Sequence, residues 1–184
     1  MSSRRQLIEL LAHRSARRGN FTLASGKQSS FYIDARLTTM SPEGLSSVGP
    51  IGLAMIRERG WDPDAVGGLT LGADPVSYAI SYASATSGRA VRAFTVRKEA
   101  KAHGTGRLIE GPFEPNDRVV VIEDVITTGG SALKAVEALR SAGARILGVL
   151  AVVDREEGGR EAIEAAGIDV ASIARVSEIL SLVP

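Results

Sequence analysis

The stretch VVVIEDVITTGGSALKAVEALR, residues 119–140, decides the fold. An apolar strand comes first, then two carboxylates, Glu123 and Asp124, then a turn of hydroxyls and glycines, and a helix opens directly after the turn. Glycines let a backbone approach an anion closely, and the unpaired N–H groups at the start of a helix attract phosphate. Two acids would repel a bare phosphate, so the pattern predicts a phosphate ligand that also carries hydroxyls, as ribose does.

Two familiar phosphate motifs do not fit this turn. No Lys follows the glycines, which excludes a P-loop, and the spacing differs from the G-x-G-x-x-G of dinucleotide-binding folds. The alternative without a ligand is a plain strand–turn–helix junction capped by Ser and Thr. The acidic pair at the strand end favours a ligand site, because a plain junction needs no carboxylates there.

Apolar runs and helical stripes alternate on both sides of this stretch. We expect strands at 21–23, 31–33, 65–71, 90–96, 118–122, 146–153 and 168–173. We expect helices from residue 3 to near 19, from 41 to near 60, from 74 through 83, and over 131–141, 161–166 and 176–180. Such alternation predicts the α/β class, with a central parallel sheet flanked by helices and a site at the carboxyl ends of the strands. We expect one domain over 1–184, in which about 1–40 form a small N-terminal hood packed on the site.

The composition is that of an ordinary globular chain. The 184 residues carry a formal net charge of +1, which gives no reason to expect nucleic acid as a partner. The chain has no Cys and two His, so thiol chemistry and disulfides are excluded and a multi-His metal site is not expected. No apolar run reaches the roughly 18 residues of a membrane span, and no secretory signal is present. We therefore expect a cytoplasmic protein that contacts no membrane.

A polar stretch over 97–115 concentrates positive charge. Between 97 and 107 it has four permanent cations against a single acid, Glu99. Glycines at 104 and 106 favour a flexible loop that closes over a diphosphate and stabilises the charge of a leaving group. The alternatives are a solvated surface loop or a nucleic-acid contact, and the absence of aromatic residues in the loop weakens the second. Its basic residues are Arg97, Lys98, Lys101, His103 and Arg107.

The phosphate turn resembles the phosphoribosyl diphosphate (PRPP) signature of type I phosphoribosyltransferases. In that family the acidic pair faces the ribose hydroxyls and the turn holds the 5′-phosphate. The resemblance implies that fold, and it assigns PRPP binding to Glu123, Asp124, Val125, Ile126, Thr127, Thr128, Gly129, Gly130 and Ser131.

Further segments are similar to orotate phosphoribosyltransferases: FTLASGKQSSFYIDAR, VGGLTLGADPVSYAI (66–80, with a turn for the diphosphate), RKEAKAHGTGRLIEG and VVDREEGGREAIEAAGI (152–168). The resemblance implies that the basic loop contacts diphosphate through Arg97, Lys98, Lys101 and His103. It also implies that the loop reaches into the partner subunit of a homodimer. It also assigns binding of the orotate carboxylate to Arg155, whose planar guanidinium group suits a carboxylate. It assigns contact with the base to Thr127. The alternative for Arg155 is a surface ion pair with Glu156 or Glu157.

One position departs from the family pattern. Many members have Lys where this chain has Gln28. The resemblance therefore supports Lys27 as an orotate contact less strongly than the other site residues. The alternative is that Lys27 is a charged surface residue without a ligand. Tyr32, Asp34 and Arg36 are expected near the same region without assigned roles.

The resemblance implies that PRPP and orotate give orotidine 5′-monophosphate and diphosphate, with Lys101, His103 and Asp124 as the catalytic residues. Mg²⁺ is expected to arrive with PRPP and to need no protein cage. Three rivals remain: a purine phosphoribosyltransferase, a PRPP-sensing regulator and a bare nucleotide-binding module. About twenty residues before Phe21 are too few for the DNA-binding module of a regulator.

Overall fold

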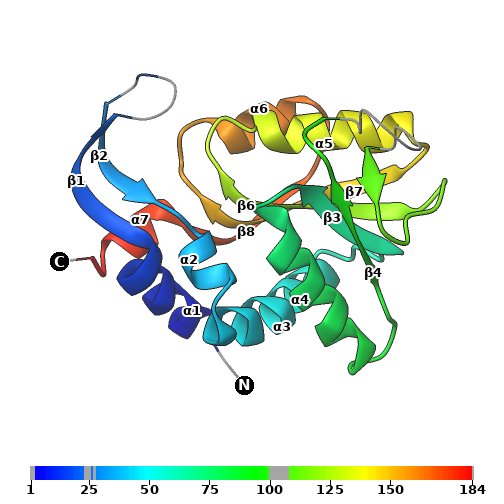
Figure 1. The fold of residues 1–184 in the computed structure, drawn as a ribbon, viewed down its shortest axis with the longest axis horizontal. Helices are drawn as coiled ribbons and strands as arrows, with labels where there is room; N and C mark the ends of the chain where they lie inside the picture. Colours follow the sequence, from blue (N-terminus) through cyan, green and yellow to red (C-terminus); the bar gives the residue numbers. More distant parts are fainter. Residues whose placement is uncertain (1–2, 23–25, 27, 100–107, 184) are drawn as a thin grey trace.

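The computed structural model describes residues 3–22, 26, 28–99 and 108–183. Its main sheet has six strands in the order β5-β4-β3-β6-β7-β8 (Figure 1). The strands are β3 (Ala65–Leu69), β4 (Arg92–Val96), β5 (Ile109–Glu110), β6 (Arg118–Ile126), β7 (Arg145–Asp154) and β8 (Val170–Arg175). All neighbours pair in parallel except β4 and β5. The predicted α/β class, a mostly parallel sheet flanked by helices, is confirmed.

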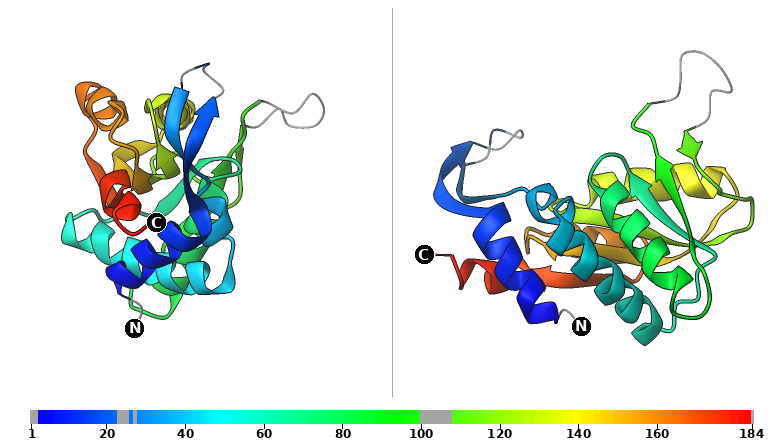
Figure 2. Two further views of the ribbon diagram at one scale, coloured as in Figure 1. Left: turned by 90° about the vertical axis from the view of Figure 1, so that its left-hand side faces the viewer. Right: turned by 60° about the horizontal axis from the view of Figure 1, so that its bottom comes forward.

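Helices cover both faces of this sheet. The helices α3 (Pro42–Glu58) and α4 (Ala73–Ala85) lie on one face, and α5 (Gly130–Ser141) and α6 (Gly159–Ala165) lie on the other (Figures 1 and 2). Successive strand residues point to opposite faces, so Val119 and Val121 of β6 pack in the cluster of α5 and α6. Val120 and Ile122 pack in the cluster of α3 and α4. Burial on both faces explains the continuous apolar run in the sequence.

The N-terminal residues build a separate hairpin beside the carboxyl ends of the sheet. The helix α1 (Arg4–Leu10) begins with a Ser3–Gln6 capping box and continues as a π-helical turn, Leu11–Ser15. The strands β1 (Ala16–Thr22) and β2 (Gln28–Ile33) then pair antiparallel, and Ala16 lies opposite Ile33. The predicted helix to near residue 19 is therefore too long, because pairing with β2 extends the backbone from Ala16 onward.

Two short elements and one strand end also differ from expectation. The helix α2 (Arg36–Thr39) and the two-residue strand β5 were not predicted, because such short elements leave no periodic pattern. The strand β6 continues through Glu123 and Asp124 to Ile126, since it stays paired with β7 over this length. The last element, α7 (Val176–Leu180), has the predicted bounds. In the part of the chain described, none of the helices has the length and apolar character needed to cross a membrane.

Candidate active site

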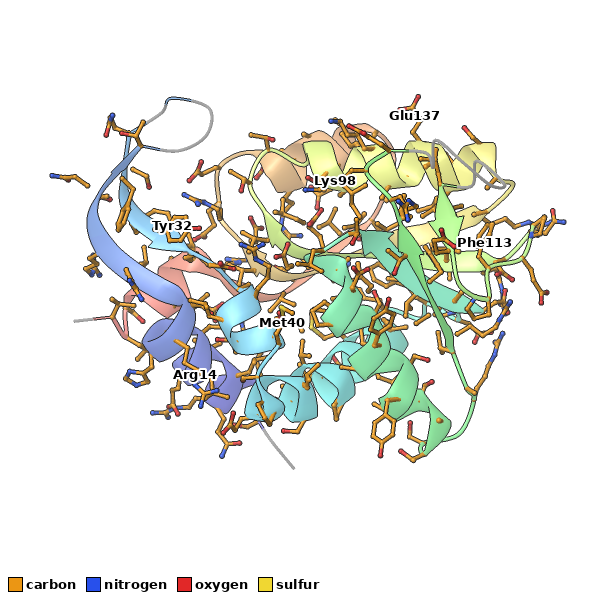
Figure 3. All side chains as sticks on the ribbon, viewed as in Figure 1. Arg14, Tyr32, Met40, Lys98, Phe113 and Glu137 are labelled. Carbon is orange, nitrogen blue, oxygen red and sulfur yellow. The ribbon has the colours of Figure 1, made fainter. Side chains whose placement is uncertain are left out.

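A cavity of about 270 Å³ opens where the hairpin meets the carboxyl ends of β3, β4, β6 and β7. Figure 3 labels two of its residues, Tyr32 on β2 and Lys98 just after β4. The structure brings together here seven residues predicted from the sequence: Lys98, Glu123, Asp124, Val125, Thr127, Ser131 and Arg155. Tyr32, Asp34 and Arg36 line the same cavity, as expected. The location is the edge where open parallel sheets bind ligands.

The phosphate turn encloses a smaller hollow of about 70 Å³ next to this cavity. Its lining adds the remaining predicted residues of the segment, which are Ile126, Thr128, Gly129 and Gly130. Gly129 has a φ of +81°, and a β-carbon there would lie 2.8 Å from the carbonyl oxygen of Gly159. A side chain at this position would therefore be both strained and obstructed. The turn and the start of α5 present unpaired N–H groups of the kind that bind phosphate.

The acidic pair is asymmetric in its surroundings. Glu123 is buried, and its Oε2 has no hydrogen-bond partner among the described residues. Burial first, and then the neighbouring Asp124 carboxylate, raise the pKa of Glu123 to about 9. Asp124 is half-buried, and its Oδ1 accepts a hydrogen bond of 2.9 Å from the backbone N of Val125. A buried acceptor without a partner suits a ligand hydroxyl, which can donate to it.

The turn after β3 closes another side of the cavity and depends on a buried carboxylate. Thr70 lines the cavity, and its hydroxyl donates to Asp74 Oδ2 at 2.7 Å. The hydroxyl of Thr95 on β4 donates to Asp74 Oδ1 at 2.8 Å and lies 2.9 Å from the Tyr78 hydroxyl. The sequence predicts only that a helix begins at Asp74-Pro75. The buried position of Asp74, 9% exposed, shows that it also fixes this turn.

The hairpin side of the cavity carries a charge pair. Arg36 donates to both carboxylate oxygens of Asp34, from Nε at 2.8 Å and from Nη2 at 2.9 Å. This contact lowers the pKa of Asp34, so its carboxylate stays charged at neutral pH. The pair leaves this wall of the cavity polar with little net charge.

Arg155 follows β7 and is only 5% exposed. Its guanidinium donates to Glu157 Oε1 from Nε at 3.1 Å and from Nη2 at 2.8 Å. The ion pair with Glu157 that the sequence left as the alternative is present, but both side chains are largely buried, 5% and 18% exposed, and Arg155 also lines the cavity. The Phe31 ring packs against the same guanidinium, with 4.7 Å between its centroid and Arg155 Cζ. Sequence reasoning missed this contact, which joins β2 to the end of β7.

The basic stretch enters the described structure only at its two ends. Lys98 lines the cavity, whereas Arg97 lines a neighbouring groove and pairs with Glu110 at 3.7 Å. Lys27, Lys101 and His103 lie outside the described residues.

Among the residues that the structure describes, no three His, Cys, Asp or Glu side chains gather closely enough to hold a metal ion.

Comparison with known proteins agrees with this geometry. Residues 54–173 match the phosphoribosyl transferase domain. This span contains the central sheet except the end of β8, together with the whole phosphate turn, so fold and site define the chain as a phosphoribosyltransferase. The chain belongs more narrowly to the orotate phosphoribosyltransferase family, as its relatives show.

The orotate phosphoribosyltransferase of Aquifex aeolicus is 48% identical over 98% of this chain and 99% of its own length. The crystal structure of the Mycobacterium tuberculosis enzyme with Fe(III) dicitrate is 43% identical with a TM-score of 0.84, over 96% of this chain and 98% of that one. The same enzyme in complex with PRPP is 40% identical with a TM-score of 0.81, over 96% and 98% of the two chains.

Proposed function

We propose that this chain transfers the phosphoribosyl group of PRPP to orotate, giving orotidine 5′-monophosphate and diphosphate in pyrimidine nucleotide synthesis. The observation that carries the proposal is one cavity lined by the acidic pair, by residues of the phosphate turn and by Arg155. Glu123, Asp124 and the turn suit a ribose 5-phosphate. Arg155 suits a base that carries a carboxylate.

The residues divide the substrates between them. The turn from Thr127 to Ser131 binds the 5′-phosphate through backbone N–H groups and hydroxyls. Glu123 and Asp124 accept hydrogen bonds from the ribose hydroxyls, and Val125 and Ile126 supply backbone between the acids and the turn. Arg155 binds the orotate carboxylate, and Thr127 contacts the base. Lys27 is a further, weaker candidate for the base.

The chemistry is displacement at the anomeric carbon. The bond from this carbon to the diphosphate oxygen breaks, and the diphosphate leaves with the electron pair. A bond forms to the ring nitrogen of orotate, whose proton is released to solvent. Positive charge builds on the sugar beside Asp124, and negative charge builds on diphosphate beside Arg97, Lys98, Lys101 and His103. Catalysis then comes from positioning and electrostatic stabilisation, with no covalent intermediate.

Mg²⁺ belongs to this proposal as a companion of PRPP. The ion prefers oxygen ligands and keeps several waters, so the diphosphate can carry it into the site. When bound, it neutralises part of the diphosphate charge.

We also propose a homodimer in which the basic loop of one subunit serves the site of the other. A groove of about 790 Å³ between α3 and α4 supports a second copy as its occupant. Tyr78 and Tyr82 line it with 52% and 78% exposure, and interfaces are enriched in such side chains. Tyr78 also joins this surface to the cavity through Thr95 and Asp74.

The domain assignment completes the proposal. We infer that 1–184 work as one unit in the cytoplasm, with about 1–40 as a hood over the cavity and 97–115 as the closing loop. The hood is supported by Tyr32 and Asp34, which line the cavity from the hairpin and its exit.

The test is orotate consumption, followed by ultraviolet absorbance in the presence of PRPP and Mg²⁺. Parallel reactions contain uracil, adenine, hypoxanthine or guanine in place of orotate. Turnover of orotate alone is the expected result. Turnover of a purine, or PRPP binding without turnover of any base, would replace the proposal with one of the rivals.

A further inference from the structure

Arg155 is fixed from two directions by residues from different parts of the chain. Its backbone N donates to the carbonyl oxygen of Ile126 at 2.9 Å, which ties the end of β7 to the end of β6. Its side chain then contacts Glu157, two residues further on, and Phe31, which belongs to β2 of the hairpin. A buried Arg without such partners would lose hydrogen bonds and adopt several rotamers.

Each partner uses a different part of the guanidinium. Glu157 Oε1 accepts from Nε and Nη2 and so occupies one edge of the plane. Arg155 Cζ lies over the Phe31 ring, at a distance from the ring centroid that is typical of a cation–π contact. Among the described residues, Arg155 Nη1 has no hydrogen-bond partner. The edge formed by Nη1 and Nη2 therefore keeps hydrogens for a planar ligand carboxylate, which such an edge binds with two parallel hydrogen bonds.

We propose that Phe31 and Glu157 are positioning residues that set the preference for a base with a carboxylate. The inference rests on the proposed function, in which Arg155 binds that carboxylate. Glu157 also neutralises the charge of Arg155, so simple attraction between opposite charges contributes little to recognition. The orientation of the Arg155 guanidinium then decides whether the site prefers a base with a carboxylate over uracil, which has a hydrogen atom at the same position.

A ligand pair isolates this contact from catalysis. Orotidine and uridine 5′-monophosphates differ only in the carboxylate, so the ratio of their dissociation constants, measured by calorimetry, reports its recognition. We expect Phe31→Leu and Glu157→Gln each to lower the preference for orotidine 5′-monophosphate roughly tenfold, about 1.4 kcal/mol. Affinity for uridine 5′-monophosphate and for PRPP should stay within about twofold, since neither residue lines the phosphate turn. In turnover, KM for orotate should rise while kcat and KM for PRPP change little.

Matched variants control for side effects. Glu161→Gln on α6 removes the same charge nearby without contacting Arg155, and it should keep the wild-type preference. Phe31→Tyr keeps the ring and should keep the preference as well. Arg155→Lys should lose the preference as fully as Arg155→Ala, because Lys keeps the charge but lacks the fork. In the Arg155→Ala background, Glu157→Gln should have no further effect.

The outcomes separate the inference from the function on which it rests. If Arg155→Ala abolishes the preference while Phe31→Leu and Glu157→Gln leave it intact, the positioning role is wrong and the proposed function stands. If Arg155→Ala itself leaves the preference unchanged, the assignment of the carboxylate to Arg155 fails. An equal loss of affinity for PRPP and for both nucleotides in the two positioning variants would indicate a general structural role and would also overturn the inference.

Discussion

The Asp124 carboxylate lies directly against Gly72. A β-carbon built on Gly72 would come within 2.4 Å of both Cγ and Oδ1 of Asp124. The turn after β3 and the acidic end of β6 are therefore packed together without room for a methyl group. This contact places an acid proposed to face the ribose beside a turn that lines the same cavity.

Gly72→Ala should damage both the fold and the site. Overpacking of this kind costs about 1–3 kcal/mol, measured as the free energy of unfolding in urea, and kcat/KM for PRPP should fall because Asp124 is displaced. In the Asp124→Ala background the added methyl has space, so its cost in stability should largely disappear. An equal cost in both backgrounds would show that the clash with Asp124 is not the cause.

The raised pKa of Glu123 makes stability depend on pH. The folded protein holds this proton up to about pH 9, whereas the unfolded chain releases it near roughly 4.3. Between these values the folded state binds more protons, so this group lowers stability as pH rises, by at most about 1.4 kcal/mol per pH unit. Glu123→Gln should become progressively more stable relative to wild type from pH 5 to pH 8 in denaturant titrations. Glu161→Gln, a change at the surface, should show no such trend; a flat difference for Glu123→Gln would contradict the prediction.

Lys101 lies outside the described residues, and its proposed role is testable by kinetics. Removing one donor that stabilises charge in a transition state costs roughly 10²–10³ in kcat, so Lys101→Ala should lose activity on that scale. A loss of less than about threefold would not fit the stabilisation of a leaving diphosphate.

Shared active sites predict complementation between two inactive variants. Lys101→Ala lacks the loop cation and Asp124→Asn lacks the ribose acid, so a mixed dimer contains one site with neither defect. Mixing the two proteins, with subunit exchange verified by a tag, should restore part of the wild-type activity. Confirmed mixed dimers without recovery would place both residues in the site of one subunit.

The groove between α3 and α4 gives a separate test of the dimer. Tyr82→Glu places a charge on the most exposed aromatic side chain of this groove and should shift sedimentation toward the monomer, because burying an unpaired charge is costly. Tyr82→Phe keeps the apolar surface and should remain dimeric. A wild-type sedimentation profile for Tyr82→Glu would move the interface elsewhere.

Local patterns were enough to predict the core of the fold. The strand in 118–122, the turn and the helix up to Ser141 appear where the sequence indicates them, because a continuous apolar run and a regular helical stripe each reflect burial within one element. The same patterns failed for β1. Residues 16–19 have no strand signal of their own, and only pairing with β2 makes them extended.

The candidate site divides in the same way. The sequence by itself determined the phosphate turn and its acidic pair. The strand, the acids, the glycines and the helix start are neighbours in the chain, so their order alone indicates a phosphate site. Only the tertiary structure decided the contacts of Phe31 with Arg155, of Gly72 with Asp124 and of Asp74 with Thr95. Each joins side chains or backbone from separate elements, and the distance between such groups depends on how helices and strands pack rather than on any local pattern.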